Sequence, residues 1–127
     1  TYSPGNTKAS AWLEEMKSKG YHFRAYPCDV ASFESAQECI AQITKDMGPV
    51  DVLVNNAGIT RDMTFKKMGK VDWDAVMKTN LDSVFNMSKA VVDDMVDRGA
   101  VPTSSRELVR RLRAAGLRLS PAARRGS

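Results

Sequence analysis

The chain has 127 residues, 43% of them hydrophobic and 27% charged, a composition that suits one globular domain with a core. No apolar run approaches the roughly 20 residues that cross a bilayer, so we expect no membrane partner. The net charge of +4 arises in the last quarter of the chain, where arginines gather: Arg106, Arg110, Arg111, Arg113, Arg118, Arg124 and Arg125. Because this charge is not spread over the domain, a nucleic-acid partner is not expected.

The two cysteines, Cys28 and Cys39, do not form a C-x-x-C pair and lack the histidine partners of a zinc site. We therefore expect reduced thiols, no metal and a cytoplasmic protein. The sequence opens at Thr1 without an initiator methionine and without the basic and apolar parts of a signal peptide. This favours a start inside a longer fold.

Helical and extended patterns alternate in the first half of the chain. Residues 8–19 place apolar side chains on one helical face before Gly20, which suits a helix end, and residues 21–26 alternate with the period of a strand. A second helix follows Ser32, a good N-cap, and runs to the stop signal Gly48-Pro49. Its expected inward positions are Phe33, Ala36, Ile40, Ile43 and Met47.

A short apolar run at 50–54, interrupted only by Asp51, predicts a strand that is buried on both faces. After a polar loop, Asp72 is the expected cap of a long helix that ends at Arg98 and Gly99. Its expected inward face comprises Trp73, Val76, Met77, Leu81, Val84, Phe85, Val92 and Met95. Helices that alternate with strands predict an α/β fold on a parallel sheet with right-handed crossovers.

The composition changes at Ala100, where an arginine-, alanine- and serine-rich stretch with two prolines begins. We expect residues 1–99 to form the domain and residues 100–127 to be disordered or to form a short basic helix. Out-of-frame reading of GC-rich DNA gives such a composition, so a frame change or a fusion is one hypothesis for its origin. An interaction arm for anionic partners is the other.

The sequence Asn55-Asn56-Ala57-Gly58 follows the predicted buried strand at 50–54. In α/β folds, ligands bind outside the carboxyl ends of the strands, and small side chains there let a flat ligand approach the backbone. The same residues are also ordinary turn chemistry. Taken alone, the motif leaves both interpretations open.

This motif is joined by Asp29-Val30 after the preceding predicted strand and by Thr79-Asn80 in the following helix, and together they resemble the short-chain dehydrogenase/reductase family in order and spacing. Over about residues 1–99, the chain is most similar to bacterial acetoacetyl-CoA reductases and somewhat less similar to 3-oxoacyl-carrier-protein reductases. The resemblance implies a partial Rossmann-type, doubly wound parallel sheet and a homotetramer for the complete protein. It also implies hydride transfer from NADPH to a 3-oxoacyl thioester, as in polyhydroxyalkanoate biosynthesis.

The resemblance also assigns contacts to the cofactor. Asp29 and Val30, next to the cofactor-binding residue Cys28, are assigned to the adenine. The residues assigned to the ribose and nicotinamide side are Asn56, Ala57, Gly58, Ile59 and Thr60. Ser3, Asn6 and Lys8 stand at a helix start where no acid is present, which favours the 2′-phosphate of NADPH over the 2′-hydroxyl of NADH. The alternative for Lys8 is an ordinary exposed lysine.

By the same resemblance, Asn80 positions a water in the proton relay, and Asp62 contacts the substrate. The alternative for Asn80 is a buried amide with structural hydrogen bonds, and for Asp62 a solvated loop. A basic stretch beside Asp62 suits the phosphates of coenzyme A or the acidic helix of a carrier protein, and charge alone does not separate these. It comprises Arg61, Lys66, Lys67 and Lys70.

The family further needs a glycine-rich turn after its first strand and a catalytic Ser, Tyr and Lys, and no Tyr-x-x-x-Lys occurs in this sequence. We therefore expect a sheet without its first strand and its C-terminal half, and no catalysis by this chain alone. Two hypotheses remain. The chain is a piece of an NADPH-dependent reductase of acetoacetyl-CoA or of 3-oxoacyl carrier protein, or it is a non-catalytic reductase-like binding module with a basic tail.

Overall fold

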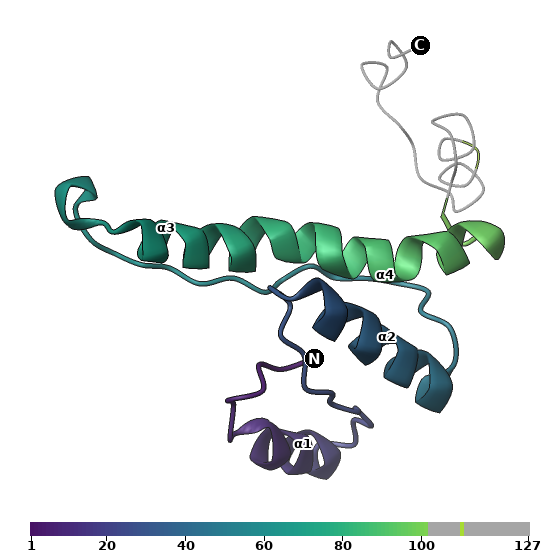
Figure 1. Ribbon diagram of the computed structural model, residues 1–127. Coiled ribbons are helices and arrows are strands. Elements are labelled where there is room, and N and C mark those ends of the chain that lie inside the picture. The colour runs from purple at the N-terminus through teal and green to yellow at the C-terminus, as the bar shows by residue number, and fades with distance from the viewer. Residues whose placement is uncertain (102–109, 111–127) are drawn as a thin grey trace.

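The computed structural model describes residues 1–101 and Arg110. Figure 1 shows α3 and α4 joined end to end as one long rod that lies across α2, whereas α1 lies apart on the far side of α2. Extended segments connect these elements. In chain order, the elements are α1 (Ala9–Ser18), α2 (Phe33–Met47), the 3-10 turn η1 (Phe65–Lys67), α3 (Lys70–Met77), the π-helical turn η2 (Lys78–Asp82) and α4 (Ser83–Asp97).

Local signals set the helix ends. At the start of α2, the Ser32 hydroxyl oxygen accepts a hydrogen bond from the Ser35 N–H at 3.2 Å, which satisfies one of the donors that a first helical turn leaves unpaired. Glycines with positive φ follow the helices: Gly20 at 85°, Gly48 at 89° and Gly99 at 66°. The predicted helices over 8–19 and 33–47 are therefore confirmed, but two of the expected inward positions of the second helix, Phe33 and Met47, are exposed.

The long predicted helix is confirmed with a different start and an interruption. It begins at Lys70, and Asp72 lies in its first turn, where the carboxylate accepts a hydrogen bond from the Gly69 N–H at 3.3 Å. Asp72 is thus a first-turn acid and not the expected N-cap residue. The π-helical turn η2 then separates α3 from α4.

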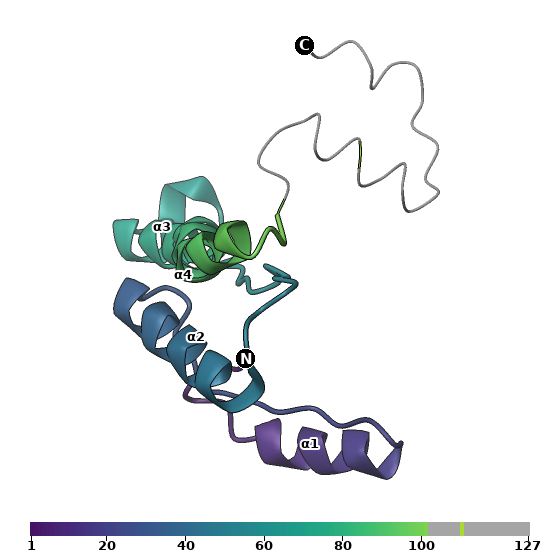
Figure 2. The same ribbon diagram turned by 90° about the vertical axis from the view of Figure 1, so that its right-hand side faces the viewer.

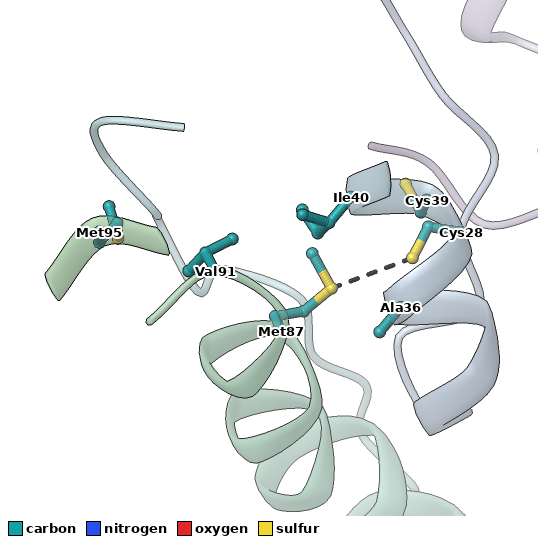
Figure 3. Packing of buried hydrophobic residues seen from close by; sticks show 7 residues of the cluster. All are labelled: Cys28, Ala36, Cys39, Ile40, Met87, Val91 and Met95. Carbon is teal, nitrogen blue, oxygen red and sulfur yellow. Dashed lines mark hydrogen bonds between the residues drawn. The ribbon is translucent and has the colours of Figure 1, made fainter. Parts of the chain in front are cut away.

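The core lies between α2 and α4. Its buried residues are Cys28, Ala36, Cys39, Ile40, Met87, Val91 and Met95. Figure 3 shows the Met87 side chain of α4 directed toward Cys28, with sulfur atoms 4.0 Å apart, and Ile40 and Ala36 of α2 beside them. Full burial of an Ile, Val or Met side chain contributes about 1.5–3 kcal/mol, so this cluster stabilises the contact between α2 and α4.

The predicted inward face of the long helix is wrong at four of its eight positions. Several of its members are exposed: Trp73, Leu81, Val84 and Phe85. The face that meets α2 instead contains two buried polar residues, Ser83 and Asn86, and the Asn86 amide donates to the Val30 carbonyl at 3.0 Å. A π-turn contains more residues than an α-turn, so for Leu81, Val84 and Phe85 a face read with a period of 3.6 loses its register at η2.

The predicted strands at 21–26 and 50–54 are extended but form no strand, and no β-strand occurs among residues 1–101. One parallel bridge forms directly after the first of them, between Tyr2 and Pro27. There the Tyr2 N–H donates to the Tyr26 carbonyl at 3.0 Å, and the Cys28 N–H donates to the Tyr2 carbonyl at 2.9 Å.

The prediction of a strand at 50–54 buried on both faces is wrong, because Val52 and Val54 are each 76% exposed. An extended segment becomes a strand only when a neighbour supplies its hydrogen bonds, and these two segments do not pair with each other.

The described chain stays on the core beyond the end of α4. Ala100 and Val101 pack against the core cluster, and both of their N–H groups donate to the Met95 carbonyl, at 2.7 and 3.3 Å. The rest of the predicted tail within 100–127 lies outside the described residues, except for Arg110. None of the helices in the described part is long and apolar enough to cross a membrane.

Candidate functional site

The loop after residue 54 is attached to η2 by the side chain of Asn80. Its Oδ1 accepts a hydrogen bond from the Ile59 N–H at 2.8 Å, and its Nδ2 donates to the Ile59 carbonyl at 2.9 Å. The amide therefore pairs with both backbone groups of one residue, as a neighbouring strand would. A Cβ on Gly58 would lie 3.5 Å from the Asn80 Oδ1, so the loop passes close to this side chain.

A second contact holds the start of the same loop. The Asn55 amide donates to the Ser88 hydroxyl of α4 at 3.3 Å. The loop is thus held at Asn55 by Ser88 of α4 and at Ile59 by Asn80 of η2, two consecutive elements of the same long helix. Ser88 was not predicted from the sequence, because a serine among apolar helical positions gives no signal of a long-range partner.

The predicted adenine-side residues form a tight turn before α2. The Asp29 N–H donates to the Ser35 hydroxyl at 3.0 Å, and Asp29 Oδ1 accepts from the Ala31 N–H at 3.1 Å. Asp29 is exposed, and Val30 is half-buried. Cys28 differs, since its side chain is 3% exposed and lies in the core. The Cys28 N–H donates to the Tyr2 carbonyl.

The burial of Cys39 affects its acidity. Burial raises the pKa of the Cys39 thiol from 9.0 to about 11, and the neighbouring Cys28 adds to this rise. Both thiols are free and buried. A protonated, buried thiol is a poor nucleophile and a poor metal ligand, so this pair is part of the core. Among the residues that the structure describes, no group of His, Cys, Asp or Glu gathers in a way that could hold a metal ion.

The predicted phosphate-binding residues gather at the start of α1. The Asn6 N–H donates to the Ser3 carbonyl at 2.8 Å, and Asn6 Oδ1 accepts from the Lys8 N–H at the same distance. These bonds form a compact turn immediately before the helix. The Ser3 hydroxyl and the Lys8 ammonium make no hydrogen bond or ion pair with the described part of the chain, and both residues are exposed.

In the described part of the chain, Thr1 lines two neighbouring cavities. The larger, about 580 Å³, brings together three of the predicted site residues, Val30, Asn56 and Ala57, with Thr1 and apolar side chains of α2 and α4. The smaller, about 370 Å³, is lined by Asn6 and Lys8 together with aromatic residues. Predicted residues that line neither cavity are Ser3, Cys28, Asp29, Gly58, Ile59, Thr60, Asp62 and Asn80.

The predicted substrate-side stretch is an exposed loop. Asp62, Lys66 and Lys67 are exposed, and the two lysines belong to η1. Lys70 forms an ion pair with Asp74 one turn along α3. A third cavity of about 370 Å³ lies beside this loop and is lined by Phe65, Met68, Gly69, Lys70 and Trp73. Asp62 does not line it.

The sequence profile described as short chain dehydrogenase matches residues 2–105, which is most of the chain. The chain belongs to the short-chain dehydrogenase family. Asn-Asn-Ala-Gly and the bonded pair Ile59 and Asn80 therefore lie within the matched part. Membership also establishes an α/β fold for the family domain to which these helices belong.

Individual relatives agree with this assignment. An acetoacetyl-CoA reductase from Cupriavidus necator is 47% identical over 96 residues, which are 76% of this chain and 39% of that protein. A 3-oxoacyl-[acyl-carrier-protein] reductase, FabG, from Staphylococcus epidermidis is 41% identical over 75% of this chain and 39% of its own length. This short-chain dehydrogenase chain thus spans about two fifths of the length of these curated relatives.

A solved structure gives the same family fold. The gluconate 5-dehydrogenase from Burkholderia cenocepacia, in complex with NADP and tartrate, aligns with a TM-score of 0.66 at 35% sequence identity. The alignment covers 72% of this chain and 36% of that one. The backbone of this short-chain dehydrogenase is therefore arranged like the corresponding third of a larger α/β domain.

Proposed function

We propose that this chain is the cofactor-side part of an NADPH-dependent reductase that converts acetoacetyl-CoA, or another 3-oxoacyl-CoA, to the 3-hydroxyacyl-CoA. The main support for this proposal is the 47% identity to an acetoacetyl-CoA reductase over 96 residues. This region includes the loop that Asn80 holds by two hydrogen bonds. The chemistry is a reduction, in which the C3 carbonyl carbon gains a hydride and its oxygen gains a proton.

The described residues fit a nicotinamide cofactor. Asn56 and Ala57 lie at the larger cavity, and no backbone–backbone hydrogen bond involves residues 51–58 within the described chain, so their N–H and C=O groups are available to a ligand. We infer that Gly58, Ile59 and Thr60 continue this lining along the loop. The exposed Asp29 carboxylate, with Val30 and the Cys28 carbonyl, is proposed to hold the adenine. When bound, NADPH would supply the hydride.

The preference for NADPH is supported by the turn before α1. The Ser3 hydroxyl, the Asn6 amide nitrogen and the Lys8 ammonium are donors without an acid among them, and the positive end of α1 begins there. The 2′-phosphate of NADPH would accept hydrogen bonds from these donors. The 2′-hydroxyl of NADH would lack the carboxylate that usually binds it.

Asn80 is proposed to have two roles in the reductase. Its amide fixes the loop at Ile59, as the hydrogen bonds show. Because both functions of that amide are engaged, the proposed water of the proton relay would bind its main-chain carbonyl, which lies in the π-helical turn. Asp62 is proposed to contact the substrate from the neighbouring loop.

Further parts of the proposal concern the complete protein. We propose that residues 1–99 belong to a doubly wound parallel sheet that this chain does not complete, and that residues 100–127 are a separate tail. Because no Tyr-x-x-x-Lys occurs in the sequence, we propose that this chain does not turn over substrate alone. The complete reductase is proposed to be a cytoplasmic homotetramer that acts in polyhydroxyalkanoate biosynthesis.

A second candidate is the reduction of a 3-oxoacyl group on a carrier protein. It is favoured by the 41% identity to FabG and by the exposed lysines of η1, which could meet an acidic helix. A third candidate is a non-catalytic binding module, whose basic tail would bind anionic partners in a salt-sensitive way.

The test is a chimera in which residues 1–99 replace the matching segment of the Cupriavidus necator enzyme. We expect NADPH consumption with acetoacetyl-CoA by the chimera and none by the 127-residue chain. A matched chimera with Lys8→Glu should raise the KM for NADPH about tenfold or more and leave the KM for NADH nearly unchanged.

Other outcomes separate the candidates. Fast turnover of acetoacetyl carrier protein with slow turnover of acetoacetyl-CoA would favour the second one. A folded chimera that consumes NADPH with neither substrate would favour the binding module. Turnover by the 127-residue chain alone would contradict the proposed inactivity.

A further inference from the structure

The end of α4 is bonded to the segment that leads into the Asn-Asn-Ala-Gly motif at 55–58. In the guanidinium group of Arg98, Nη1 donates to Asp51 Oδ1 at 2.8 Å and Nη2 donates to the Val50 carbonyl at 2.6 Å. The third nitrogen, Nε, donates to Asp94 Oδ2 at 2.9 Å. A single exposed ion pair contributes little, but three acceptors around one planar guanidinium group fix its orientation. Arg98 therefore joins the helix end to two consecutive residues of the segment.

The helix end that carries Arg98 is itself held in place. Gly99 leaves the helix with a φ of 66°. Ala100 and Val101 then pack against the core, and both of their N–H groups donate to the Met95 carbonyl. Met95 is buried in the core. Arg98 thus extends from a fixed point of the α2–α4 core toward the segment.

Arg98 makes the first of three side-chain attachments between this segment and the long helix that α3, η2 and α4 form together. The Asn55 amide donates to the Ser88 hydroxyl, and both backbone groups of Ile59 are bonded to Asn80. Figure 2, a view nearly along the long helix, shows the segment rising from the end of α2 to the side of α4, and Figure 1 shows it continuing toward the start of α3. The segment and the long helix therefore run in opposite directions.

The spacing of the attachments matches on the two elements. Between Asn80 and Arg98 the helix advances 18 residues, or about 27 Å at about 1.5 Å per residue. Between Asp51 and Ile59 the segment advances 8 residues, or about 26 Å at an extended rise of about 3.3 Å. A shift by one residue would move the segment by about 3.3 Å, which is more than a hydrogen bond tolerates. The three attachments together therefore specify one register.

We propose that Arg98, acting through Asp51 and the Val50 carbonyl, is a positioning residue for the cofactor-binding motif that follows them. Its contacts set how far the segment advances along the long helix, and so where Asn56 and Ala57 lie at the larger cavity. In the described chain, Arg98 is not hydrogen-bonded to any of the predicted cofactor contacts. This role rests on the proposed function, because the motif is the proposed site of NADPH.

An ion pair that only stabilises the end of α4 would behave differently. Its loss would lower the fraction of folded protein and leave the affinity of the folded protein for NADPH unchanged. Loss of a positioning contact instead leaves the fold intact and lets the motif occupy several positions, so it weakens the binding of NADPH. The two roles are therefore separated by the order of the segment and by the KM for NADPH.

The first measurement is made on the 127-residue chain without cofactor. Backbone order parameters from nitrogen relaxation are about 0.85 for a rigid amide and below about 0.6 for a flexible one. We expect Arg98→Ala to lower the values at residues 52–54 from about 0.85 to about 0.6 or less and to leave those of α2 unchanged. Lys89→Ala is the matched control, because it removes an exposed ion pair with Asp93 on the same helix and should change none of these values.

The second measurement uses the chimera of residues 1–99 with the Cupriavidus necator enzyme. We expect Arg98→Ala to raise the KM for NADPH about fivefold and to leave kcat and the KM for acetoacetyl-CoA unchanged. Asp51→Ala should raise the KM for NADPH by less. The double variant should raise it no more than Arg98→Ala alone, because that change already removes the contact with Asp51. Lys89→Ala should again change none of the three constants.

Two results would overturn the positioning role. One is an unchanged order parameter at residues 52–54 in Arg98→Ala. The other is a chimera in which Arg98→Ala lowers the folded fraction or kcat but leaves the KM for NADPH unchanged. A chimera that keeps Arg98 and consumes no NADPH would instead contradict the proposed function, and the order parameters of the 127-residue chain would still decide whether Arg98 holds the segment.

Discussion

The α2–α4 pair and the extended segments beside it are built from similarly apolar sequence but differ in completeness. In the helix pair, Ala36 is fully buried and Val91 is 4% exposed, and the buried Asn86 amide is satisfied by the Val30 carbonyl. In the extended segments, Val52 and Val54 are 76% exposed and the backbone along 51–57 has no backbone partner within the described chain. We call the α2–α4 pair the closed region, because its apolar side chains are buried and its buried amide has a partner. We call residues 51–57 the open region, because their side chains are largely exposed and their backbone has no backbone partner within the described chain.

The difference follows from where each element finds its hydrogen bonds. A helix pairs its backbone internally, so two helices need only bury a face against each other. A strand pairs with a neighbour, so it is incomplete until that neighbour is present. The stability of the closed region should therefore depend on how its side chains pack. The local exchange rates of the open region and its loop should depend on the side-chain hydrogen bonds that hold them to the long helix.

The largest effect is expected from overpacking the closed region. Ala36→Leu inserts a larger side chain at a position with no exposed surface and should lower the free energy of unfolding by about 1–3 kcal/mol. Ala41→Leu lies on the same helix at an exposed position and is the matched control, with little expected effect. Urea unfolding measures both. Equal losses in the two variants would contradict a closed α2–α4 contact.

A smaller effect is expected from the buried thiol of Cys39. Its pKa is about 11 in the folded chain and 9.0 when exposed, so between these pH values the unfolded chain loses a proton that the folded chain keeps. Stability should therefore fall as pH rises from 9 to 11, by less than the roughly 1.4 kcal/mol per pH unit that one proton allows. Cys39→Ala should remove this part of the slope. Parallel stability curves for the two proteins would show that the thiol does not contribute.

The smallest effect on stability, and a local one, is expected from Asn80. Asn80→Ala removes both hydrogen bonds to Ile59, so exchange of the Ile59 amide should rise about fivefold to tenfold while the unfolding midpoint hardly changes. Asn55→Ala removes only the contact with Ser88 and should leave the Ile59 amide as it was. If Asn80→Ala lowered global stability as much as Ala36→Leu does, the loop would belong to the closed region.

The candidate site could be located from the sequence but not described. Asn-Asn-Ala-Gly and Asn80 were identified together by resemblance, and the structure bonds Asn80 to Ile59, the residue that directly follows this motif. The pair of hydrogen bonds at Ile59 and the bond from Asn55 to Ser88 were not predicted. Both depend on helical residues about 20 to 30 positions further along the chain. The role of each predicted cofactor contact stays a prediction.

The sequence by itself determined most of the helix ends, although not the start of the long helix at Lys70. Ser32 caps α2, and glycines at 20, 48 and 99 adopt positive φ after their helices, because capping and left-handed turns depend on residues a few positions apart. Only the tertiary structure decided which face of the long helix is buried, because the π-turn at Lys78–Asp82 shifts the register and polar Asn86 turns inward to meet Val30. It also decided that residues 21–26 and 50–54 remain extended rather than becoming strands, because pairing depends on a neighbour that local sequence cannot specify.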